Sequence, residues 1–327
     1  MLRGKRFRRL LPGVWVWHDH EMTEADHVLA ARLALPERAR LTGVSAIRRL
    51  GLDIGAAQPA HFVIAGDHHL ELEDVVLHRT DRMPPAGDED VHPVAAFVEY
   101  CRWASVLDAI CVGDWLLFNG HMTPVQLREL VHVEQWREGS AQARWVCGLL
   151  DERSRSLPES RCRAYLIFAG LPWPESNVEI MVDGRVAAIV DLALLRWNCV
   201  VEYEGSQHQE QRGQYLRDVD RYALLRRRGL DYVQITKESA KAPMKVVTEV
   251  YRMLARNGFD GPAPDFGATW RLLHRPIPRA VPPLARPAFR DPSLRQAAVT
   301  QRPFRPTAGP QTDANPPLLA RPAGNGR

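Results

Sequence analysis

The segment Cys-Val-Val-Glu-Tyr-Glu at positions 199–204 constrains the fold most, because it has the pattern of a strand with two unlike faces. Side chains alternate along a strand, so Glu202 and Glu204 share one side while Val201 and Tyr203 share the other. A strand that runs through a core does not carry two carboxylates on one face without compensation. We therefore expect either solvent or a bound cation beside this face.

A third acid, Asp191, ends the apolar run that precedes this strand. If residues 191–202 form a hairpin that turns at Arg196 and Trp197, Asp191 lies directly across from Glu202, with Cβ atoms about 5 Å apart. Converging carboxylates raise one another's pKa unless a divalent metal neutralises them. Oxygen ligands of this kind suit Mg²⁺ or Mn²⁺. The pattern predicts that three carboxylates converge on such an ion.

Residues 136–257 read as helix, helix, three strands, helix, strand and helix. Asp183-Gly184 is a typical two-residue hairpin turn between the first two strands. Glu159 lies near the start of the second helix and could reach the carboxylates if that helix crosses the sheet. The expected helices are 141–150, 159–169, 213–229 and 241–256, and the expected strands are 177–182, 185–191, 198–205 and 230–236.

The N-terminal part has weaker signals. In residues 1–55, a Pro-Gly turn separates two strand-like runs, Thr23 is placed to cap a helix, and a second short helix ends at Gly51. These elements are compatible with a winged helix, although the second helix offers few polar side chains that could read bases. Residues 56–135 contain two strand-like runs followed by mostly helical sequence, with a further helix capped by Thr123.

The net charge of +4 divides unevenly along the chain. Residues 275–327 contain nine arginines and two acids, a charge of +7, so the other 274 residues sum to −3. The same segment holds twelve of the 25 prolines and little apolar periodicity, which is typical of disorder. A tail of this kind either keeps the chain soluble or adds salt-sensitive attraction to phosphates.

The cellular location follows from what the chain does not contain. Its five cysteines include no close pair, which disfavours a disulfide framework and a CxxC zinc site. The histidines near positions 18–20 and 67–69 lack further ligands at metal spacing. There is no apolar run of about 20 residues, and the basic N-terminus is not followed by a cleavage site. We expect a cytoplasmic protein with no membrane partner.

The order of motifs in residues 155–257 resembles the PD-(D/E)XK nuclease superfamily and, more narrowly, the Vsr-like endonuclease domains. Many of the latter are grouped as family 559 of domains of unknown function. The run begins with ESRCRAYLIFAGLP, continues with VDLALLRWNCVVEYEGSQHQ and ends with YLRDVDRYALLRRRGLDYVQIT. Upstream, RRLLPGVWV and VSAIRRLGLD resemble the winged-helix region of AbiEi-like antitoxins. The resemblance implies a cytoplasmic, metal-dependent endodeoxyribonuclease.

For the acids, the resemblance implies that Asp191 and Glu202 bind Mg²⁺ or Mn²⁺ and that Glu159 assists catalysis. Glu204 stands where the superfamily usually has Lys, and would act as a base or as another ligand. Gln234 stands where relatives often carry Arg, so one phosphate contact is missing. Without the resemblance, Glu202 and Glu204 could simply form the solvated face of an edge strand.

For binding of DNA, the resemblance points to a turn and to the helix that follows it. Gln207 and His208 match the Gly-x-Gln-His turn of the family, and His208 would contact the scissile phosphate or donate to the leaving group. Tyr215, Asp218 and Arg221 lie close to one face of the next helix. Arg221 would meet a phosphate while Asp218 orients its guanidinium. Alternatively, the last two are only a surface pair.

We thus predict an α+β protein with a mixed central sheet in an α/β/α nuclease-like domain at 151–260. A winged-helix-like domain at 1–55, a mixed linking region at 56–150 and a disordered tail at 275–327 complete it. The predicted activity is metal-dependent hydrolysis of DNA, with a homodimer as one possible form. Two alternatives stay open: a non-catalytic antitoxin-type DNA-binding regulator, and an interaction partner in a toxin–antitoxin or phage-defence pair.

Overall fold

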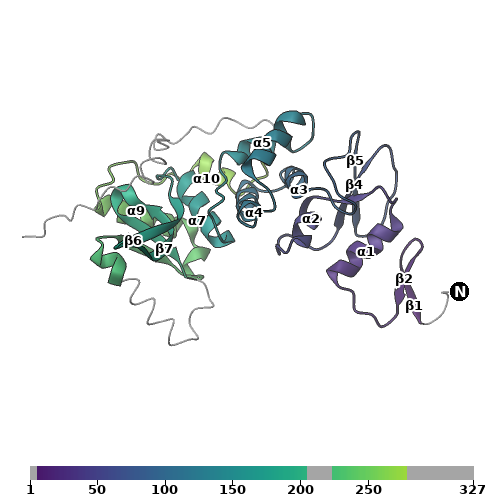
Figure 1. The fold of residues 1–327 in the computed structure, drawn as a ribbon, viewed down its shortest axis with the longest axis horizontal. Coiled ribbons are helices and arrows are strands. Elements are labelled where there is room, and N and C mark those ends of the chain that lie inside the picture. The colour runs from purple at the N-terminus through teal and green to yellow at the C-terminus, as the bar shows by residue number, and fades with distance from the viewer. Residues whose placement is uncertain (1–5, 205–222, 278–327) are drawn as a thin grey trace, which may run out of the picture. The chain divides into compact units, whose positions relative to one another are not determined.

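The computed structural model describes residues 6–204 and 223–277, which all belong to one compact unit spanning Met1–Arg290. The described part mixes helices with three separate sheets, so the predicted α+β class is confirmed. One sheet has two strands, one has three and one has four (Figure 1). The four-stranded sheet carries the predicted site.

The chain begins with a hairpin, β1 (Phe7–Leu11) and β2 (Val14–Trp17), followed by helix α1 (Glu24–Ala34). The predicted cap of this helix is present. The hydroxyl of Thr23 accepts a hydrogen bond from the Asp26 backbone N–H at 3.2 Å, and the Asp26 carboxylate accepts one from the Thr23 backbone N–H at 2.9 Å. These reciprocal bonds satisfy backbone donors that a helix start leaves open.

Helix α2 (Gly43–Arg49) is the short second helix, and Gly51 follows it with a φ of +105°. Both of its arginines are engaged in ion pairs. Arg48 contacts Glu24 at 2.7 Å and Asp53 at 2.8 Å, while Arg49 contacts Asp90 at 3.1 Å. Both guanidinium groups of α2 are therefore bound by neighbouring acids, and its predicted role as a recognition helix stays a prediction.

The three-stranded sheet consists of β3 (Arg40–Leu41), β4 (Ala60–Ala65) and β5 (Val75–Thr80). Strand β3 pairs antiparallel with β4, and β4 pairs parallel with β5. This pairing joins segments on both sides of the boundary predicted at residues 55 and 56. The two predicted N-terminal regions therefore share a sheet.

A helical block follows, and two of its helices begin at capping side chains. Ser105 accepts from the Asp108 N–H at 3.1 Å, and Thr123 accepts from the Gln126 N–H at 3.2 Å, as predicted for Thr123. In the part of the chain that the structure describes, no helix has the length and apolar content needed to span a bilayer. The block comprises α3 (Pro93–Tyr100), α4 (Val106–Phe118), α5 (Pro124–Val133) and α6 (Ser140–Cys147).

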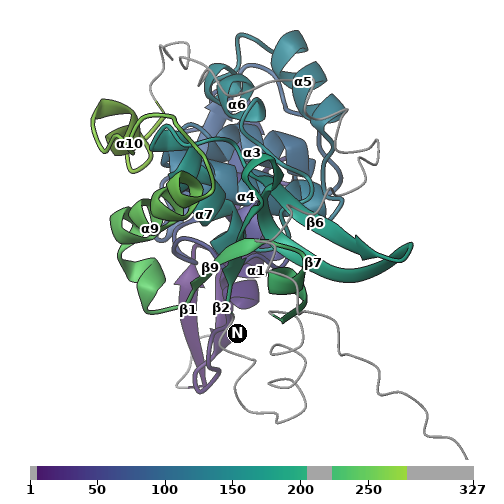
Figure 2. The same ribbon diagram turned by 90° about the vertical axis from the view of Figure 1, so that its left-hand side faces the viewer.

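The four-stranded sheet has the order β6-β7-β8-β9, with β9 parallel to β8 and the other pairs antiparallel. Asp183 and Gly184 form the predicted hairpin turn with φ values of +48° and +76°. Helices α7 and α9 lie beside the sheet (Figures 1 and 2). The elements are α7 (Leu157–Phe168), β6 (Glu175–Val182), β7 (Arg185–Leu194), β8 (Cys199–Tyr203), β9 (Asp231–Ile235), α9 (Pro243–Arg256) and α10 (Ala268–Leu272).

Apolar residues cover both faces of this sheet. Val201 packs in the large core that also contains residues of α7 and α9. Val200 packs in a second, smaller cluster with Leu225 and Leu230 from the segment that precedes β9. Adjacent residues of β8 thus enter different cores, which is the alternation expected from the sequence.

Two histidines on neighbouring strands of the three-stranded sheet form a pH-dependent pair. His61 Nδ1 and His78 Nε2 lie 2.9 Å apart. Burial lowers the pKa of both rings, for His78 to about 4. The ordinary pKa of histidine is near 6.5. Between pH 6.5 and pH 4, the unfolded chain therefore takes up a proton that the folded chain does not. The free energy of unfolding should therefore fall as the pH is lowered through this window.

We expect a loss of about 2 kcal/mol between pH 7.5 and 4.5 from this histidine pair. Urea unfolding at a series of pH values measures it. In His78→Gln the dependence over this window should be weaker, because one titrating ring is absent. An equal slope in both proteins would contradict this assignment.

Candidate functional site

The four-stranded sheet forks where the predicted acids lie. Strands β7 and β8 pair over only three positions, from Leu194 opposite Cys199 to Leu192 opposite Val201. Beyond that point β7 continues to Arg185 paired with β6 alone, and β8 continues paired with β9. The fork therefore opens directly after the last β7–β8 pair.

Asp191 and Glu202 are the first residues past that pair. The turn consists of Leu195–Trp197 with Asn198 at a φ of +51°, and the strand pairing ends one residue before each acid. The predicted turn is confirmed, and so is the predicted register as far as Leu192 and Val201. By alternation Glu202 belongs to the side of Val200, whereas Asp191 lies between Val190 of the smaller cluster and Leu192 of the large core.

The carboxylate of Asp191 is held in the fork itself. Its Oδ2 accepts a hydrogen bond from the backbone N–H of Tyr203 at 2.7 Å. This bond links β7 to β8 at a place where the backbone ladder has ended. Burial, reinforced by the negative charge of Asp191, raises the pKa of Cys162 on α7 to about 12. Asp191 therefore also acts electrostatically on the helix that packs against the sheet.

Glu202 is buried, and its parallel partner on β9 is Gln234. Glu204 follows the end of β8 and accepts a hydrogen bond from Gln234 Nε2 at 3.0 Å. The two positions that depart from the resembled family, Glu204 and Gln234, are therefore bonded to each other. Glu202 and Gln234 lie level with each other on β8 and β9.

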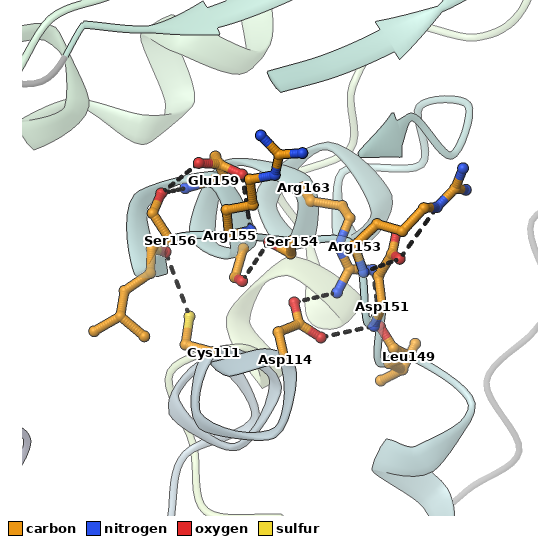
Figure 3. A network of polar contacts seen from close by, with 12 residues as sticks. Cys111, Asp114, Leu149, Asp151, Arg153, Ser154, Arg155, Ser156, Glu159 and Arg163 are labelled. Carbon is orange, nitrogen blue, oxygen red and sulfur yellow. Dashed lines mark hydrogen bonds and ion pairs between the residues drawn. The ribbon is translucent and has the colours of Figure 1, made fainter. Parts of the chain in front are cut away.

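Glu159 lies in the first turn of α7 and is buried, and its carboxylate has three hydrogen-bond donors, of which Ser156 and Arg155 are seen in Figure 3. Ser156 Oγ donates at 2.8 Å, the Arg155 backbone N–H at 3.0 Å and Asn177 Nδ2 at 2.7 Å. These contacts close the start of the helix and connect it to β6. In the structure Glu159 anchors α7 to β6.

Asn177 is a residue that the sequence analysis missed. It occupies the β6 position opposite Asp191 and has a φ of +50°, which only a few non-glycine residues adopt readily. Its amide donates to Glu159 and, at 2.8 Å, to the Arg153 carbonyl. An asparagine within a strand-like run gives no pattern from which this role could be read.

A buried ion pair anchors α7 on its other side (Figure 3). Arg163 of α7 contacts Asp114 of α4 at 2.7 Å, and both side chains are almost completely inaccessible to solvent. Asp114 also accepts from the Asp151 backbone N–H at 2.7 Å, while Arg163 donates to the Leu149 carbonyl at 2.8 Å. Burial raises the pKa of Asp114, and the guanidinium of Arg163 opposes that rise.

The remaining predicted residues belong to the segment 205–222, which lies outside the described part of the chain. Their predicted roles in catalysis and in DNA binding stay predictions. The residues concerned are Gln207, His208, Tyr215, Asp218 and Arg221.

The expected convergence of three carboxylates is not found. Within residues 6–204 and 223–277, no group of three or more His, Cys, Asp or Glu side chains is arranged to hold a metal ion. The reason is visible in the contacts: Glu159 bonds to α7 and β6, and Glu204 bonds to Gln234. The two acids that directly follow the last β7–β8 pair are Asp191 and Glu202. Hard oxygen donors of this kind fit Mg²⁺, which proteins commonly hold through one or two carboxylates plus substrate phosphates.

Comparisons with known proteins give little guidance to activity. Two uncharacterized proteins of Mycobacterium tuberculosis, from strains CDC 1551 and H37Rv, are each 27% identical to this chain over 165 residues. The aligned part is 50% of this chain and 61% of each relative, so the chain spans less than two thirds of their length. No family model and no solved structure matches the chain.

Proposed function

We propose that this protein is a metal-dependent endodeoxyribonuclease whose active site is the fork between β7 and β8. The observation that carries the proposal is that Asp191 and Glu202 directly follow the last β7–β8 pair, Leu192 opposite Val201. Carboxylates brought close together favour binding of a divalent cation, because the charge of the ion offsets their mutual repulsion. The resemblance to Vsr-like and PD-(D/E)XK domains supports the same conclusion.

In this proposal Asp191 and Glu202 hold Mg²⁺ or Mn²⁺. The hydrogen bond from Tyr203 N–H orients the Asp191 carboxylate before any ligand arrives. When bound, the ion supplies a more acidic water and stabilises negative charge on a phosphate. Glu204, at the end of β8, is the carboxylate placed to accept a proton, whereas Glu159 keeps α7 on the sheet.

Nicking of supercoiled plasmid tests this role of Glu204. Wild-type protein should nick in Mg²⁺ or Mn²⁺ and not in EDTA. We expect Glu204→Gln to lower the rate by about 10²-fold, the usual contribution of a proton acceptor. Gln234→Ala, which removes the partner of Glu204, serves as the control for positioning and should have a smaller effect. No cleavage of plasmid, linear, mismatched or single-stranded DNA by the wild type would contradict the proposal.

One observation favours a second function, a non-catalytic regulator of antitoxin type. The bond between Glu204 and Gln234 joins the two positions that depart from the resembled family. Two side chains that hydrogen-bond to each other within the sheet are what we expect in a nuclease-like domain that has lost its activity. In that case DNA or a toxin partner would bind without cleavage, and substitutions at Asp191 would leave binding unchanged.

A further inference from the structure

Trp103 is a large aromatic side chain that the fold holds in place yet leaves open to solvent. It follows α3 and is 60% exposed. Its side chain donates a hydrogen bond to Glu99, and the guanidinium carbon of Arg102 lies 4.8 Å from its ring centroid. Two charged side chains, Glu99 and Arg102, therefore hold the indole in its orientation. An exposed tryptophan that is preorganised in this way is suited to bind a partner.

A second tryptophan has the same arrangement. Trp136 is 52% exposed, and the guanidinium carbon of Arg137 lies 4.7 Å from its ring centroid. The loops that carry the two tryptophans are tied together by an ion pair between Arg102 and Glu138. At Gly139 there is no room even for a Cβ atom, which would meet the Val98 carbonyl. We call Trp103 and Trp136 together the tryptophan platform.

The end of the described chain runs directly toward this platform. The Val106 N–H donates to the Arg275 carbonyl at 3.1 Å, and Pro276 forms an antiparallel bridge with Ser105. The Ile277 N–H then donates to the Ala104 carbonyl at 3.3 Å. The described chain therefore ends at Ile277 opposite Ala104, the residue that follows Trp103 in the sequence.

The chemistry of those residues matches the platform. Residues 278–284 read Pro-Arg-Ala-Val-Pro-Pro-Leu. Proline-rich segments bind to aromatic side chains at low entropic cost, because their extended conformation is preformed. Pro282 lies five residues beyond Ile277, a reach of about 15 Å in that conformation. Arg279 also carries the charge that complements Glu138, which is well exposed beside the platform.

We propose that the tryptophan platform is the docking site for the chain's own segment 278–284. Docking covers indole faces that would otherwise remain in water, and it holds the start of the arginine-rich tail against the helical block. The proposal is independent of nuclease activity, since it involves none of the acids at the fork.

Limited trypsin digestion of the full-length chain tests the proposal. Trypsin does not cut before proline, so within the segment after Ile277 the first bond available is Arg279–Ala280 and a distal one is Arg295–Gln296. We expect the first bond to be cut about 10-fold more slowly than the distal bond, which corresponds to docking worth about 1.4 kcal/mol. In Trp103→Ala the two rates should become similar.

Tail variants keep the test valid if Trp103→Ala disturbs the fold. Pro282→Ser with Pro283→Ser should remove the protection, whereas the same changes at the distal Pro316 and Pro317 should not. Equal rates at both bonds in the wild type would overturn the proposal, as would protection that survives Trp103→Ala. Protection that grows with protein concentration would instead assign the platform to the tail of a second copy, and would overturn docking within one chain.

Discussion

Replacing Asp114 with alanine is expected to lower the free energy of unfolding by about 3–5 kcal/mol. The reason is the partner that remains. Arg163 is almost completely inaccessible, so the variant leaves a guanidinium in the core without its carboxylate. The Asp151 N–H also loses its acceptor, which adds the cost of a buried unsatisfied donor.

Urea denaturation measures this effect, with Glu129→Ala as a control because Glu129 is an exposed acid on another helix. That control should change the free energy of unfolding by less than about 0.5 kcal/mol. The double replacement Asp114→Leu with Arg163→Met should recover most of the loss, since it removes both charges. A loss below about 1 kcal/mol in Asp114→Ala would show that the pair does not anchor α7.

Changing Asp191 to asparagine is expected to abolish DNA cleavage with little effect on folding. Asparagine keeps an oxygen that can accept the Tyr203 N–H, so the link between β7 and β8 survives. It removes the negative charge that we propose holds the ion. Loss of about 4 kcal/mol of stabilisation in the transition state corresponds to at least about 10³-fold in rate.

The matched control is Glu179→Gln, which neutralises an exposed acid on β6 of the same sheet. Its cleavage rate should equal that of the wild type. Urea unfolding of both variants checks that neither change acts through the fold. If Asp191→Asn cleaves at the wild-type rate, the fork is not the active site.

Much of the fold could be predicted because its signals are local. The Thr23 cap involves residues three apart, and the turn at Asp183 and Gly184 involves two neighbours. The β7–β8 register that ends beside Asp191 and Glu202 follows from strand alternation and from a short turn, both of which the sequence displays. Features that depend on nearest neighbours along the chain are the ones a sequence reveals.

Other features depend on contacts between distant segments, and these were not predicted. Asp114 and Arg163 meet across 49 positions of sequence, although an acid inside an apolar helix is a signal that could have been read. Glu159 was expected to face the carboxylates, but Ser156 and Asn177 bind it instead. Nothing local indicates that Asn177 adopts a positive φ to reach that helix.

Calorimetric titration with Mn²⁺ tests most directly whether the acids at the fork bind an ion. The wild-type protein should bind one ion, and Asp191→Asn and Glu202→Gln should each weaken the affinity by at least about 10-fold, while Glu179→Gln should not. Identical titration curves for all four proteins would contradict the account. An ion whose affinity does not change when either carboxylate is neutralised is not bound by those carboxylates.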